Sequence, residues 1–291
     1  MSKIIIGIHG LDNKPPESLL RTWWLKAIRE GLKNVGQFHF LFRFRFVYWA
    51  HFLNSQPLDP KIENKNDPLY LEYPYVKSTH EVHNKENPLR RKILDYIDRQ
   101  MEKIFLNEDM SINFSGVTDL IISRYFRDLS LYYSDATIIV ENEQKKVRYL
   151  LREELANVLR RHRDDEILLI AHSMGSIIAY DTLIHDAPDV PIDTLVTIGS
   201  PLSLPIIISK IMKELHKSGR KVTKPPTPEN VKKWYNLADL RDKVTLNYNL
   251  ADDYLPNTQG VLPEDEIVYN DYEYEGDKNP HKSFGYLRTP E

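Results

Sequence analysis

The chain has 291 residues, of which 41% are hydrophobic and 28% are charged, so it can bury a large core and has the composition of a globular protein. Its formal net charge of −3 argues against a protein whose main partner is nucleic acid, because such a protein needs a basic surface. The absence of cysteine excludes disulfides, thiolate metal sites and a cysteine nucleophile.

The first elements predicted are a strand, a helix and a second strand. Residues 3–8 form a β-branched apolar run that is too short for a signal sequence or a membrane helix, and a turn-rich stretch follows at 12–16. Apolar residues recur every four positions from 18 to 33, which predicts a helix with one buried face. The nearly continuous apolar run at 44–49 is typical of a buried parallel strand.

Residues 51–135 interrupt this alternation. The segment is first rich in Pro, Asn and Lys, and then has helical periodicity between residues 89 and 104. We interpret it as a helical cap or lid inserted into a single domain that spans residues 1–291.

The second half of the chain returns to alternating strands and helices. Its predicted elements are a helix over 147–159, a strand at 167–170, a helix from 174, strands at 194–198 and 231–237 with a long loop around 225–226 between them, and a last strand at 267–269. This alternation predicts an α/β fold with a mostly parallel central sheet flanked by helices.

The strongest motif is the Ala-His-Ser-Met-Gly sequence at 171–175, between an apolar strand and a helical pattern. It has the form of a nucleophile elbow, in which a sharp turn exposes the serine and requires small residues two positions before and after it. Ala171 and Gly175 meet that requirement, so Ser173 is the candidate nucleophile.

A serine nucleophile needs a histidine base and a carboxylate, expected in the chain order Ser, acid, His. Of the histidines after the elbow, His185 and His216 fall within helix-like stretches, which leaves His281 as the candidate base. Asp239 and Asp242 both follow the strand predicted at 231–237, and either carboxylate is a candidate acid.

With these motifs the chain resembles an α/β-hydrolase, and the elbow is similar to that of Bacillus-type small lipases. The Thr-Ile-Gly-Ser-Pro-Leu sequence at 197–202 also resembles the post-strand loop of lipase-like members. The resemblance covers the sheet strands and the loops of the triad but not the insertion. Ala171 stands where the common pattern has glycine, a departure that the lipase resemblance makes tolerable.

The resemblance implies further roles. Asp242 is favoured over Asp239 because Asp242-Lys243-Val244 resembles the Asp-x-Val loops of the family. The backbone N–H groups of Leu11, in the His-Gly-Leu sequence after the first strand, and of Met174 are the expected oxyanion donors. The implied activity is cleavage of a small-molecule or lipid-like carboxylic ester through an acyl-enzyme on Ser173, without a metal or other cofactor.

Other functions remain open on the sequence alone. A thioesterase or an amidase would use the same triad, and a non-catalytic binding protein would keep the fold without the reaction. An exposed apolar lid would allow action at a lipid surface, although the many charges of residues 61–100 make this less attractive. No segment has the length of an integral membrane span, so we expect a cytoplasmic protein; the substrate-binding residues and the oligomeric state are not predicted.

Overall fold

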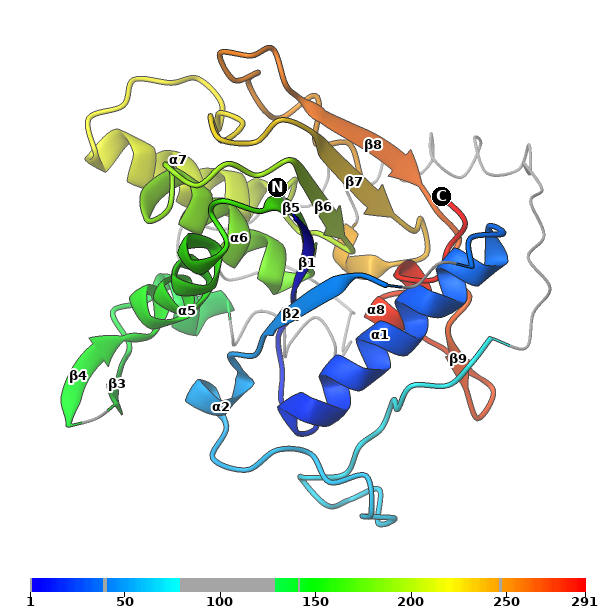
Figure 1. Cartoon of the computed structure of the whole chain (residues 1–291). Helices are drawn as coiled ribbons and strands as arrows, with labels where there is room; N and C mark the ends of the chain where they lie inside the picture. Colours follow the sequence, from blue (N-terminus) through cyan, green and yellow to red (C-terminus); the bar gives the residue numbers. More distant parts are fainter. Residues whose placement is uncertain (1, 39–40, 79–128, 141, 246–247) are drawn as a thin grey trace, which may run out of the picture.

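The computed structural model describes residues 2–38, 41–78, 129–140, 142–245 and 248–291. Its centre is a six-stranded sheet in which every neighbouring pair of strands is parallel. In spatial order the strands are β2 (Arg43–Val47), β1 (Lys3–Ile8), β5 (Glu166–His172), β6 (Thr194–Ile198), β7 (Trp234–Ala238) and β8 (Pro263–Ile267). This arrangement confirms the predicted α/β fold with a mostly parallel central sheet flanked by helices (Figure 1).

Helices cover both faces of the sheet. Helix α1 (Glu17–Asn34) and the short α8 (Ser283–Tyr286) lie together on one face, while α5 (Val147–Arg161) and α6 (Met174–His185) pack together on the other (Figure 1). The remaining helical elements are α2 (Ala50–Leu53), α7 (Pro205–Lys217) and the 3₁₀ turn η1 (Lys243–Thr245). In the described ranges, no helix combines the length and the hydropathy that crossing a bilayer requires.

The side chains of β1 point alternately to the two faces of the sheet, and each face is covered by its own hydrophobic core. Ile4, Ile6 and Ile8 are buried in the core beneath α5 and α6, while Gly7 faces the opposite side. A Cβ at Gly7 would lie 2.9 Å from the Trp24 ring of α1, so glycine lets that helix approach the strand.

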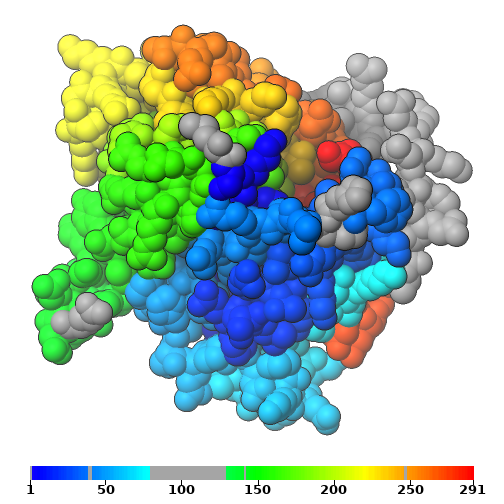
Figure 2. All heavy atoms as spheres, in the orientation of Figure 1, coloured from blue at the N-terminus to red at the C-terminus, as the bar shows by residue number. Residues whose placement is uncertain are grey.

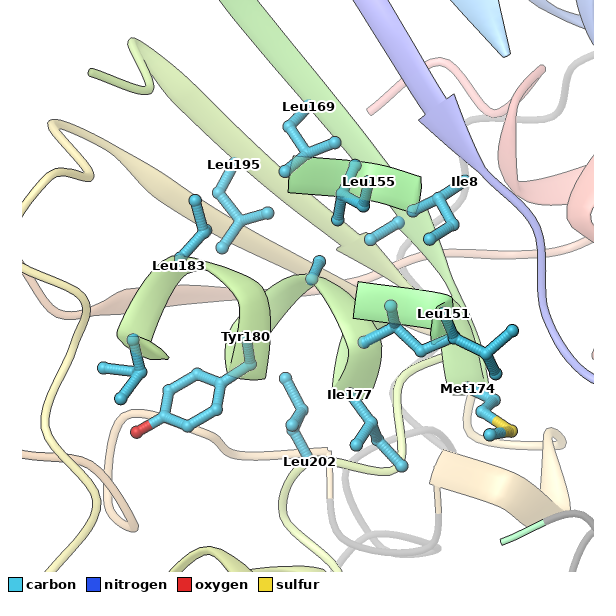
Figure 3. Packing of buried hydrophobic residues seen from close by; sticks show 14 of the residues in the cluster. Ile8, Leu151, Leu155, Leu169, Met174, Ile177, Tyr180, Leu183, Leu195 and Leu202 are labelled. Atoms are coloured by element: carbon cyan, nitrogen blue, oxygen red, sulfur yellow. The ribbon is translucent and has the colours of Figure 1, made fainter. Parts of the chain in front are cut away.

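Figure 3 shows how closely α6 is enclosed. Every residue from 174 to 184 of this helix is buried, which is possible because its sequence is apolar on nearly all sides. Leu151 and Leu155 of α5 and Leu169 of β5 pack in the same cluster (Figure 3). The helix that follows the elbow is therefore fixed rigidly against the sheet.

Several boundaries differ from those predicted. The last strand of the sheet is Pro263–Ile267 rather than 267–269, and β7 begins at Trp234 rather than at 231. Strand β8 contains three consecutive acidic residues, of which Glu264 and Glu266 are exposed, as expected for an edge strand with one solvated face, and a search for apolar runs therefore missed it.

Two hairpins were not predicted. Strands β3 (Thr137–Val140) and β4 (Glu143–Lys146) form an antiparallel pair that projects from the molecule (Figures 1 and 2). A second pair, β9 (Glu273–Tyr274) and β10 (Asp277–Lys278), precedes the C-terminal helix. The helical periodicity predicted at 89–104 lies outside the described residues.

Candidate active site

Ser173 occupies a sharp turn between β5 and α6. Its φ of 54° and ψ of −127° place a non-glycine residue in a strained region of backbone space. The turn is enclosed on two sides, because a Cβ at Gly10 would lie 2.7 Å from the Ser173 Cβ and a Cβ at Gly175 would lie 2.6 Å from the His9 carbonyl oxygen. Glycine at positions 10 and 175 is therefore needed to let the first loop reach the elbow.

The structure brings Ser173, His281 and Asp242 together at the carboxyl edge of the sheet. His281 Nε2 lies 2.9 Å from Ser173 Oγ, and His281 Nδ1 lies 2.8 Å from Asp242 Oδ2. Because the carboxylate can only accept, Nδ1 carries the hydrogen and the Nε2 lone pair faces the serine hydroxyl. The three side chains form a continuous hydrogen-bonded chain, and Ser173 and Asp242 are each only 1% exposed.

The Asp242 carboxylate is held by two further donors. Its Oδ1 accepts the backbone N–H of Val244 at 2.9 Å, and its Oδ2 accepts the Tyr286 hydroxyl at 2.8 Å. Burial and the adjacent Asp242 charge raise the pKa of Tyr286 well above its usual value, so this phenol remains a donor. These contacts fix the direction in which the carboxylate faces His281.

Asp239, the alternative acid, has different partners. Its carboxylate accepts the Arg241 guanidinium at 2.5 and 3.0 Å and the backbone N–H of Asn270 at 2.6 Å. It also caps the turn by accepting the backbone N–H of Arg241 at 2.8 Å. The contacts therefore distinguish the two candidate acids: of these two carboxylates, only that of Asp242 is hydrogen-bonded to His281.

The two expected oxyanion donors adjoin the elbow. Leu11 follows Gly10, which packs against Ser173, and Met174 is the first residue of α6. Within the described part of the chain, neither backbone N–H has a hydrogen-bond acceptor. The Met174 N–H also lies at the positive end of the α6 dipole, where negative charge is stabilised.

The loop that carries Leu11 is held by hydrogen bonds at its start, through His9, and at its end, through Lys14. Burial lowers the pKa of His9 well below its usual value, and this neutral ring accepts the Trp49 backbone N–H on Nε2 at 3.0 Å. Its Nδ1 then donates to the Gly10 carbonyl at 2.7 Å. At the far end, the Lys14 ammonium donates to the carbonyl oxygens of Leu11 and Asp12.

Two supporting residues were not predicted. Gly199 has a φ of 55°, and a Cβ there would lie 3.1 Å from Asp242 Oδ2 and 3.3 Å from His281 Nδ1. Asn270 donates through Nδ2 to the carbonyls of Pro280 and Lys282, at 2.7 and 2.8 Å, on either side of His281. Gly199 could have been found from the sequence, because it lies in the 197–202 stretch that resembles a lipase-like loop. Asn270 lies in no recognisable motif.

A cavity of about 1010 Å³ lies beside these residues. Its wall includes His172 and Lys282, the chain neighbours of Ser173 and His281, together with His9 and Lys14. The rest of the wall comes from residues within 12–15, from α1 and from residues within 53–58, 65–73 and 274–284. Among the residues that the structure describes, no cluster of His, Asp or Glu side chains is arranged to hold a metal ion.

The comparisons with known proteins agree with the fold. The family model of the PGAP1-like alpha/beta domain matches residues 135–247, which is less than half of the chain. The matched segment runs from β3 to η1 and includes Ser173 and Asp242, but it ends before His281. No curated protein matches the chain significantly. Residues 135–247 therefore form a segment that is similar to a hydrolase-like α/β family.

Proposed function

We propose that the protein is a serine hydrolase that cleaves a carboxylic ester through an acyl-enzyme on Ser173. The observation that carries the proposal is the hydrogen-bonded chain from Ser173 Oγ through His281 to Asp242, built from three loops that are distant in sequence. The strained backbone of Ser173 and the hydrolase-like family match support the same reaction class.

In the first half of the reaction, Ser173 Oγ attacks the ester carbonyl carbon while His281 Nε2 takes the hydroxyl proton. Asp242 stabilises the imidazolium that forms. The negative charge on the former carbonyl oxygen is stabilised by the N–H groups of Leu11 and Met174. His281 then gives its proton to the leaving alcohol, and the acyl group remains on Ser173.

In the second half, water attacks the acyl carbon with His281 as base. The proton taken from water passes through His281 to Ser173 Oγ as the acyl–oxygen bond breaks, and the carboxylic acid leaves. The free serine and the neutral imidazole are restored, so the cycle balances without a cofactor as reactant.

Labelling with a fluorophosphonate probe tests the nucleophile. We expect the folded protein to be labelled at Ser173, with the site identified by peptide mass spectrometry, and Ser173→Ala to remain unlabelled. Ser218→Ala removes a serine at the end of α7, away from the triad, and should label like the wild type. Folded wild-type protein without an adduct at Ser173 would overturn the proposal.

A screen of 4-nitrophenyl esters, acyl thioesters and acyl anilides identifies the bond that is cleaved. We expect esters to give the highest kcat/KM, with activity lost in Ser173→Ala. Preferential turnover of thioesters or anilides would assign a thioesterase or an amidase to the same triad, and probe labelling without turnover of any class would contradict ester cleavage.

A further inference from the structure

Lys282 holds an ammonium group inside the cavity, one residue after His281. Its Nζ lies 5.4 Å from the centroid of the Tyr73 ring and 5.6 Å from that of Phe284. Its backbone carbonyl is fixed by Asn270 at 2.8 Å, so the segment that carries it is held as firmly as that of His281. Asn270 therefore holds the backbone on both sides of His281, and the Lys282 side chain enters the cavity from this fixed segment.

Several other charged groups of the cavity wall are engaged within the protein. Lys65 is paired with Glu275 at 3.1 Å, and Asp277 accepts the Tyr73 hydroxyl at 2.5 Å. Asp67 accepts the backbone N–H of Leu69 at 2.8 Å.

Lys282 differs from these groups. In the described residues, its ammonium has neither a hydrogen-bond acceptor nor a carboxylate at ion-pair distance, and it faces two aromatic rings instead. Cation–π contacts of this kind replace only part of the lost hydration, so the group retains its capacity to donate to an anion.

The electrostatic environment agrees with an anion site. Burial and the neighbouring Lys14 lower the pKa of Lys282 to about 7, while the carboxylates of Asp12 and Glu72 oppose the shift. A bound anion would offset both unfavourable contributions, because it supplies a counter-charge and hydrogen-bond acceptors in place of water.

We propose that Lys282, reinforced by the positive charge of Lys14, forms an anion subsite in this cavity, and that the substrate is an ester bearing a carboxylate or phosphate group. This inference rests on the proposed function and defines its substrate class. The ester reaches Ser173 while the anionic group of the same molecule occupies the cavity beside His172 and Lys282.

Matched substrates test the subsite by turnover. Mono-4-nitrophenyl glutarate and 4-nitrophenyl valerate differ by a carboxylate on the acyl side, and 4-acetoxybenzoate and its methyl ester differ by one on the alcohol side. We expect the wild type to prefer the anionic member of at least one pair by about tenfold in kcat/KM, as a charge-assisted hydrogen bond predicts. Lys282→Gln should abolish this preference and Lys282→Arg should retain it. The control Lys232→Gln removes a lysine that pairs with Asp193 outside the cavity wall and should leave the preference unchanged.

Calorimetry on the Ser173→Ala variant measures binding without turnover. Inorganic phosphate and glutarate are the two probes, and the tighter of them identifies the anion class. Adding Lys282→Gln should weaken the tighter probe about tenfold, with folding checked by circular dichroism.

The two sets of measurements separate the possible failures. Equal kcat/KM for the charged and neutral esters, together with phosphate and glutarate binding that is insensitive to Lys282→Gln, would overturn the anion subsite. An absence of ester turnover and of probe labelling at Ser173, with anion binding still dependent on Lys282, would instead overturn the hydrolase.

Discussion

Asp242 and Asp239 both lie near the end of β7, but their carboxylates have different hydrogen-bond partners. Asp242 Oδ2 is bonded to the imidazole of His281, whereas Asp239 joins Arg241 to the backbone of Asn270. A comparison of the two asparagine variants therefore separates catalysis from stability at the scale of single residues.

We expect Asp242→Asn to lower kcat about 10³- to 10⁴-fold, because an amide in place of the carboxylate favours the wrong imidazole tautomer. Asp239→Asn should keep most of the activity but lower the free energy of unfolding by about 1.5–3 kcal/mol, the range for hydrogen bonds to a charged group. The measurements are steady-state hydrolysis of a 4-nitrophenyl ester and urea unfolding. Equal loss of kcat in both variants would contradict the assignment of Asp242.

Gly199 gives a second prediction at this scale. Gly199→Ala should lower kcat/KM about tenfold, because its Cβ would press on Asp242 and His281, and should lower stability by about 1–2 kcal/mol through its left-handed φ. Gly219→Ala is the matched control, since Gly219 has a φ of 83° but a Cβ there would meet no atom within 4 Å. Both variants should lose stability, and only Gly199→Ala should lose activity; equal activity in the two would refute the steric argument.

How much of the site the sequence predicts depends on how local each signal is. The small-x-Ser-x-Gly motif between a strand and a helix predicts Ser173 as the nucleophile, and the small number of histidines after it favours His281 as the base. Two aspartates follow the same strand, so the residues alone left two candidate acids, and the resemblance of Asp242-Lys243-Val244 to the family loop favoured Asp242. Asn270 was missed because its partners at 280 and 282 become neighbours only when the chain folds back after β8.

At the scale of elements, an ion-pair network ties three helices together behind the elbow. Arg148 of α5 lies 2.8 Å from Asp181 of α6 and also pairs with Glu214 of α7. Tyr132 donates its hydroxyl to the same Asp181 carboxylate at 2.8 Å. Because Asp181 is 1% exposed, these partners take the place of the water that would otherwise solvate its carboxylate.

Arg148→Met should therefore destabilise the protein by about 3–5 kcal/mol, the cost of leaving a buried charge without its partner. Lys146→Met is the control, because Lys146 pairs with Asp135 at the exposed surface and should produce no measurable change. Urea unfolding followed by tryptophan fluorescence measures both variants. Similar stabilities of the two would show that the network does not support the helices.

The elements differ in how well their sequence reveals them. The predicted strands at 3–8 and 194–198 match β1 and β6, because strands buried on both faces appear as apolar runs. The β3–β4 hairpin was missed because its second strand, Glu-Gln-Lys-Lys, is polar throughout and is stabilised by pairing rather than burial.

At the scale of the whole molecule, two buried histidines make stability depend on pH. Burial lowers the pKa of His9 and of His172 well below 6.5, the usual value that each regains on unfolding. Below pH 6.5 the unfolded chain therefore binds protons that the folded chain does not, so acid favours unfolding.

The free energy of unfolding should fall by about 1.4 kcal/mol per pH unit for each of these histidines once the pH is well below 6.5. Urea unfolding between pH 7.5 and 5.5 measures the slope. His172→Gln should reduce it by the contribution of one histidine, and a stability independent of pH over this range would contradict the buried neutral state.

The position of β1 inside the sheet has a consequence for biosynthesis. This strand is translated before β5, one of its two neighbours in the sheet, which follows roughly 160 residues later, about 10 to 30 s at usual elongation rates. Over that interval the β5-facing edge of the nascent strand and the isoleucines that it later buries beneath α5 and α6 have no native partner. Until β5 emerges, this edge and its apolar side chains are therefore accessible to chaperones that bind exposed apolar segments.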